Sequence, residues 1–124
     1  HPIIVIFGAL ITQMTSRMEL HVIVNVRAGN GKSKIIWQQL KQQLKTPFQE
    51  YMTEFPGHGT ELAKTIVQQC NTKTLILVVG GDGTIHEVIN GTIKSEHVAV
   101  GFIPAGLIIL SFLVFPTPVT EISG

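Results

Sequence analysis

An apolar run at residues 74–79 (TLILVV) leads without a break into Gly80-Gly81-Asp82-Gly83-Thr84, and this junction constrains the fold most. A short, nearly continuous apolar run is typical of a strand that is buried on both faces. Two adjacent glycines permit positive φ angles and allow backbone N–H groups to approach a ligand closely. The next residues, through Gly91, carry apolar side chains at helical spacing. The segment therefore predicts a buried strand, a tight loop and a helix.

Strand-like and helix-like stretches alternate in the same way along the rest of the chain. We expect further strands at residues 21–26, 50–54 and 98–103, and helices at residues 33–44 and 60–69, the second with Thr60 as its N-cap. Short connections between such elements favour a parallel sheet with helices on both faces. The fold class is therefore α/β, a three-layer sandwich with a mostly parallel sheet.

Three glycine-containing loops follow the first three expected strands, at residues 27–31, 57–59 and 80–83. In open parallel sheets, ligands bind beyond the carboxyl ends of the strands. All three loops fall on that edge, so we expect them to border one ligand site.

The loop at residues 80–84 favours phosphate as that ligand. Backbone N–H groups at the start of a helix form an anion site, and Thr84 could both cap the helix and contact a phosphate oxygen. Asp82 would repel phosphate directly, but a Mg²⁺ ion between the two would satisfy both. The alternative is that Gly-Asp-Gly is turn chemistry alone.

The longer motif, GGDGT followed by residues 85–91 (IHEVING), resembles the signature of the diacylglycerol kinase catalytic family. That family includes bacterial lipid kinases and the sphingosine and ceramide kinases. NAD kinases share the GGDGT core and phosphofructokinases have a relative of it, but the Glu-Val-hydrophobic-Asn-Gly continuation points to lipid kinases. His86 stands where relatives commonly have Asn. The resemblance implies the nucleotide-binding fold that NAD kinases and diacylglycerol kinases have in common.

Two earlier segments resemble family motifs in the same order, so the resemblance covers about residues 18–106. Residues 25–29 (NVRAG) are similar to an Asn-Pro-x-Ser/Ala-Gly loop, with Val26 in the place of proline, and Thr53 with residues 57–59 (GHG) is similar to a nucleotide-contacting Thr and Gly-His-Ala loop. The resemblance implies ATP and Mg²⁺ as cofactors, with Asp82 as the metal ligand. The implied cofactor-binding residues are Asn25, Gly29, Thr53, Gly80, Gly81, Asp82, Gly83, Thr84 and Glu87.

The function implied by the resemblance is transfer of the ATP γ-phosphate to the hydroxyl group of diacylglycerol or a related lipid. In the family, a second and largely β domain holds the lipid and the catalytic base. We therefore expect no catalytic group here, an inactive fragment, and membrane contact only through that other domain. The alternatives are another kinase of the GGDGT superfamily, such as an NAD kinase, and a non-catalytic, self-associating remnant.

Both ends of the chain are apolar and depart from the family pattern. Residues 1–17 are expected to be an extension that precedes a true start at Met18, or else an additional strand. After Gly106 the family continues with Thr and then Asn-Asp, whereas residues 107–112 here read LIILSF. We expect truncation or a frameshift there, with residues 107–124 as a divergent tail. Apolar ends at residues 3–11 and 107–115 favour homo-oligomers.

Composition excludes several other classes of protein. A net charge of +1, without a run of basic residues, argues against nucleic-acid binding and against strong membrane attraction. The single Cys70 and five scattered histidines predict neither a disulfide nor a zinc site, and a cytoplasmic location fits. Lys32 is not a P-loop lysine, because Val26 stands where that motif needs glycine. His58 and His86 fall on the ligand-edge loops, and Trp37 is expected in the core.

Overall fold

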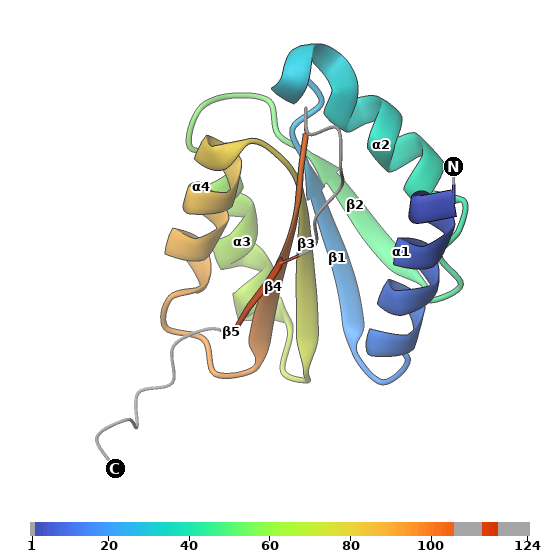
Figure 1. Ribbon diagram of the computed structural model, residues 1–124. Coiled ribbons are helices and arrows are strands. Elements are labelled where there is room, and N and C mark those ends of the chain that lie inside the picture. Colours follow the sequence, from blue (N-terminus) through green and yellow to red (C-terminus); the bar gives the residue numbers. More distant parts are fainter. Residues whose placement is uncertain (1, 106–112, 117–124) are drawn as a thin grey trace.

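The computed structural model describes residues 2–105 and 113–116, which form one five-stranded sheet with helices on both faces (Figure 1). The strand order is β2-β1-β3-β4-β5. Four strands are parallel, and β5 pairs antiparallel with β4. This arrangement confirms the predicted α/β class with a mostly parallel sheet. The strands are β1 (Glu19–Val24), β2 (Phe48–Met52), β3 (Thr74–Gly80), β4 (Val98–Pro104) and β5 (Leu113–Pro116).

Helices cover the two faces of the sheet in pairs, as Figure 1 shows. Helices α1 (Pro2–Met14) and α2 (Lys32–Lys41) lie on one face, and a short 3-10 turn, η1 (Ala28–Gly31), leads into α2. Helices α3 (His58–Gln69) and α4 (Asp82–Thr92) pack together on the other face. The helices and the sheet make the three layers that the alternating sequence pattern predicts.

The core consists of two apolar clusters, one on each side of the sheet. All seven residues of β3 are buried, and the side chains of residues 75–79 alternate between the two clusters. Trp37 and Leu40 of α2 close one cluster, and Ala63 and Ile66 of α3 close the other. Burial on both faces explains why the strands read as continuous apolar runs rather than alternating ones.

The N-terminal apolar segment is a helix, so the expectation of an additional strand there is wrong. Ile4 and Ile11 are buried in the core with Leu40. Gly8 lies against Gln43 so closely that a Cβ at Gly8 would come within 2.4 Å of the Gln43 Cβ. Residues 4, 8 and 11 follow helical spacing, and packing against α2 and the residues after it decides between two conformations that an apolar run permits equally.

Helix α3 begins at His58, two residues earlier than the Thr60 N-cap that the sequence predicts. Its N-cap is Gly57, which has a positive φ of 89°. The Thr60 hydroxyl instead donates to the backbone carbonyl of Glu87, 2.8 Å away on α4. A contact between helices has replaced the local cap.

The C-terminal end of the chain is described only at residues 113–116, which form β5. Of the predicted tail, residues 107–112 and 117–124 lie outside the described residues. Among the helices of the described ranges, none is both long enough and apolar enough to span a lipid bilayer.

Candidate functional site

The loops that follow β1, β2 and β3 meet at the carboxyl edge of the sheet, at the top of Figure 1, and enclose a cleft of about 300 Å³. Six of the nine residues predicted for the nucleotide site line it. They are Asn25, Thr53, Gly81, Gly83, Thr84 and Glu87. The other three, Gly29, Gly80 and Asp82, are not among the residues that line it. The parallel topology thus brings together segments far apart in the sequence, as expected.

Asn25 and Thr84 join the end of β1 to the start of α4. The Asn25 Nδ2 donates to the Thr84 hydroxyl at 3.2 Å, and the Asn25 Oδ1 accepts the backbone N–H of Arg27 at 3.1 Å. Gly80 makes this contact sterically feasible, because a Cβ there would approach both the Asn25 Cβ (3.2 Å) and the Thr84 Oγ1 (3.3 Å). Gly80 is buried, and its lack of a side chain lets Asn25 and Thr84, which both line the cleft, stay in contact.

The loop at residues 80–84 turns from the sheet into α4 without a left-handed residue. Gly81 is extended, with φ −108° and ψ −175°, and its carbonyl accepts the N–H groups of Thr84 and Ile85 at 3.1 and 3.2 Å. The glycines here serve close approach and open space rather than positive φ, which occurs instead at Gly29, Gly31 and Gly57.

The first turn of α4 faces the cleft with little side-chain bulk. A Cβ at Gly83 would meet no other atom within 4 Å, although Gly83 lines the cleft. The N–H groups of Asp82 and Gly83 stand at the helix start, where backbone donors have no intrahelical partner. This combination of unshielded donors and free space is what a phosphate group needs.

Asp82 is the first residue of α4 and is exposed beside the cleft. A carboxylate at this position favours the positive end of the helix dipole. One carboxylate next to amides that can bind phosphate also suits Mg²⁺, which usually takes one or two carboxylates together with phosphate oxygens and water. The Asp82 carboxylate therefore fits the expected Mg²⁺ ion.

Glu87 borders the cleft, and its carboxylate is engaged by the protein. The two oxygens accept the backbone N–H groups of Gly57 and Gly59, both at 3.0 Å. A side chain at Gly59 would be excluded, because its Cβ would lie 2.8 Å from the Glu87 Oε1. Glu87 thus holds the loop between β2 and α3 in place at the cleft.

Four cleft residues were not singled out from the sequence: Arg27, Glu54, Phe55 and Pro56. The Phe55 ring stacks on His58, with centroids 4.3 Å apart and an interplanar angle of 13°. The His58 Nδ1 accepts the backbone N–H of Glu54 at 2.9 Å. An aromatic residue directly before proline and glycine was the available sequence signal. His86 is exposed on α4 and does not line the cleft.

Comparison with known proteins identifies relatives of this architecture. The sequence pattern of the diacylglycerol kinase catalytic domain matches residues 19–108. The protein named "Putative lipid kinase YtlR" from Bacillus subtilis is 38% identical over 89 residues, which cover 68% of this chain and 28% of that protein. Sphingoid long-chain bases kinase 1 from Arabidopsis thaliana is 30% identical over 108 residues, covering 78% of this chain and 14% of the relative. Human sphingosine kinase 1 is 30% identical over 77 residues, 59% of this chain and 20% of the relative.

Proposed function

The chain belongs to the diacylglycerol kinase catalytic domain family, and on that premise we propose that it is the ATP-binding segment of a lipid kinase. The observation that carries the proposal is the cleft at the carboxyl edge of the sheet, where the first turn of α4 presents backbone donors beside Gly81 and Gly83. In the whole protein, the γ-phosphate of ATP would pass to a lipid hydroxyl group.

The phosphate groups would lie over the first turn of α4. There the N–H groups of Asp82 and Gly83 would donate to phosphate oxygens, and the dipole of α4 would favour their negative charge. Thr84 lines the cleft with its hydroxyl accepting from Asn25, so the Thr84 proton is free to face a phosphate oxygen. Arg27, on the loop after β1, adds a cation to the same cleft.

Asp82 would hold the Mg²⁺ ion, with phosphate oxygens and water completing its coordination. When bound, the ion neutralises phosphate charge that develops during transfer. Asp82 is exposed at the helix start, so its carboxylate can reach such an ion without a change in the core.

The base and ribose would lie on the β2 side of the cleft. Phe55 and Pro56 form an apolar wall there, next to Thr53 at the end of β2. Aromatic stacking of a base contributes about 1–3 kcal/mol in nucleic-acid-binding proteins. The Phe55 ring, supported by His58, suits the same contact.

The lipid acceptor concerns the whole protein. The chain spans 28% of the length of the bacterial relative and 14% of the first plant relative. Diacylglycerol, after which the family is called, and the sphingoid bases in the names of several relatives are therefore candidate acceptors. That this segment alone transfers no phosphate stays a prediction, as does its cytoplasmic location.

The substitution Gly83→Ala tests the phosphate site. Because the added Cβ meets no protein atom, the fold should be unchanged or more stable by about 0.5–1 kcal/mol, as for other glycines in helices. The Cβ would nevertheless occupy phosphate space, so calorimetry should show Mg-ATP affinity falling about tenfold, a cost of about 1.4 kcal/mol.

Asn90 is exposed on the same helix, so Asn90→Ala is the matched control and should leave the affinity for Mg-ATP unchanged. Binding of inorganic tripolyphosphate, which has no base or ribose, distinguishes the phosphate site from the base site. Gly83→Ala should weaken its binding, whereas Phe55→Ala should weaken only ATP. Equal affinity of the unaltered chain and Gly83→Ala for Mg-ATP would overturn the proposed phosphate position.

A further inference from the structure

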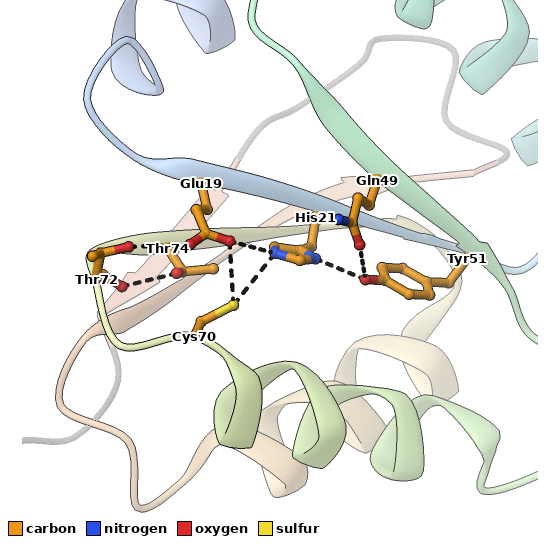
Figure 2. Close-up of polar contacts among 7 residues, drawn as sticks. All are labelled: Glu19, His21, Gln49, Tyr51, Cys70, Thr72 and Thr74. Atoms are coloured by element: carbon orange, nitrogen blue, oxygen red, sulfur yellow. Dashed lines mark hydrogen bonds and ion pairs between the residues drawn. The ribbon is translucent and has the colours of Figure 1, made fainter.

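A second polar site lies at the amino edge of the sheet, opposite the cleft. Glu19 and His21 are two residues apart on β1, so their side chains leave the strand on the same face. Cys70 immediately follows α3, the helix that covers that face. Figure 2 shows the three side chains turned toward one another. The nucleotide site uses none of them.

The three polar atoms form a nearly equilateral triangle. The His21 Nε2 lies 3.2 Å from the Glu19 Oε1 and 3.4 Å from the Cys70 Sγ, and the sulfur lies 3.5 Å from the same Oε1. His21 and Cys70 are each only 3% exposed, whereas the Glu19 side chain is half-exposed. The triangle is therefore anchored in the protein and reachable from solvent at one corner.

The hydrogen bonds around His21 leave its Nε2 without a proton to share when the ring is neutral. The Tyr51 hydroxyl donates to the Gln49 Oε1 at 2.9 Å, so it accepts from the His21 Nδ1–H, 2.8 Å away. A neutral ring then presents a lone pair to a carboxylate oxygen and to sulfur. The one proton of the Cys70 thiol cannot be donated to both the Glu19 oxygen and the His21 nitrogen. A cation at the centre of the triangle would be attracted to all three atoms, the oxygen, the nitrogen and the sulfur.

We propose that the Glu19 Oε1, the His21 Nε2 and the Cys70 Sγ bind a Zn²⁺ ion, with water as the fourth ligand. Tetrahedral zinc with ordinary bond lengths places such ligand atoms about 3.4–3.6 Å apart, close to the triangle described. A mixed sulfur, nitrogen and oxygen set suits zinc, whereas Mg²⁺ and Ca²⁺ prefer oxygen ligands alone.

Neighbouring residues already hold each ligand in position. Tyr51 orients His21, as outer partners of metal-binding histidines do, and the Thr72 hydroxyl donates to the second oxygen of Glu19 at 3.2 Å. The Cys70 N–H bonds to the Ile66 carbonyl at the end of α3. Zinc binds the thiolate form of cysteine, so zinc binding would release a proton from Cys70.

A zinc ion at this site would link β1 to the end of α3. His21 and Cys70 are 49 residues apart in sequence, and Cys70 also belongs to the core cluster on that face of the sheet. A metal that binds only the folded chain adds its binding free energy to the stability of the fold. Zinc should therefore raise the thermal midpoint of unfolding.

Titration of the purified full chain with Co²⁺ tests the proposal directly. Cys70 is the single cysteine, so a thiolate-to-cobalt charge-transfer band can come only from Cys70. We expect that band to saturate at one equivalent and to disappear when Zn²⁺ is added. In spectra of the unaltered chain labelled at histidine nitrogens, Zn²⁺ should shift the Nε2 of His21 and not that of His97.

The variant Glu19→Gln removes the half-exposed ligand and should weaken Zn²⁺ binding about tenfold or more. Glu61→Gln, an exposed glutamate on α3, is the matched control and should bind like the unaltered chain. The absence of a charge-transfer band in the unaltered chain would overturn the proposal. An unchanged zinc affinity in Glu19→Gln would do the same, because that residue supplies the third ligand.

Discussion

The carboxylate of Glu87 connects the two helices on one face of the sheet. From the middle of α4 it accepts two backbone N–H groups, of Gly57 and Gly59, at the first turn of α3. Those donors have no intrahelical partner, and the positive end of α3 favours an anion. The Thr60 hydroxyl returns a hydrogen bond to the Glu87 carbonyl. One residue of the motif therefore fixes the position of the loop that borders the cleft.

Replacing Glu87 with Gln leaves one acceptor oxygen for two N–H groups. The amide that loses its partner then faces an NH₂ group, so Glu87→Gln should lower the free energy of unfolding by about 1–3 kcal/mol. Denaturant titration measures this, and the exposed Glu61→Gln should change it by less than about 0.5 kcal/mol. Equal stability of the two variants would mean that the Glu87 contacts do not form.

At the scale of elements, the strands and most helices could be predicted because both faces of the sheet are covered, and burial leaves a plain apolar signal in β1, β3 and β4. Details set by distant partners could not. Thr60 has the chemistry of an N-cap, but its hydroxyl donates to the backbone carbonyl of Glu87 on α4. The Glu87 carboxylate instead accepts the Gly59 N–H at the start of α3. The triangle around Cys70 was equally hidden, since spacing along the chain gives no hint that α3 ends beside β1.

Helix α1 shows the same limit. Nine consecutive residues, 3–11, are nearly all apolar, so their pattern fits a strand or a helix equally. The contacts made with Leu40 and Gln43 select the helix. Its inner face belongs to the same core cluster as Trp37.

Two neighbouring substitutions in α1 test whether this helix is part of the core. Ile11 is fully buried, so Ile11→Ala should lower the free energy of unfolding by about 2–5 kcal/mol. Leu10 is 45% exposed, so Leu10→Ala should cost about 0.5 kcal/mol or less. Denaturant titrations of the two proteins would refute the packing of α1 if their midpoints coincided.

For the whole molecule, the sheet separates two kinds of chemistry. Its carboxyl edge gathers three loops around a cleft suited to phosphate, and its amino edge gathers Glu19, His21 and Cys70. The apolar layers lie between the two edges, and Cys70 belongs both to one core cluster and to the amino-edge triangle. The two sites share no residue.

Self-association was predicted from the apolar ends, and the outer face of α1 supports it as a proposal. Val5, Ile6 and Leu10 are 49%, 55% and 45% exposed there. Sedimentation velocity should show a mass that rises with concentration, and Ile6→Lys should shift the chain toward monomer. A single monomeric species at every concentration would contradict the proposal.

The central claim is that nucleotide phosphate binds over the first turn of α4. Backbone N–H resonances of the full chain, followed during titration with Mg-ATP, test it most directly. We expect the largest shifts at Asp82, Gly83 and Thr84, smaller ones in the loops at residues 25–31 and 53–59, and none at Cys70. Saturating Mg-ATP that left the resonances of residues 82–84 unmoved would contradict the account.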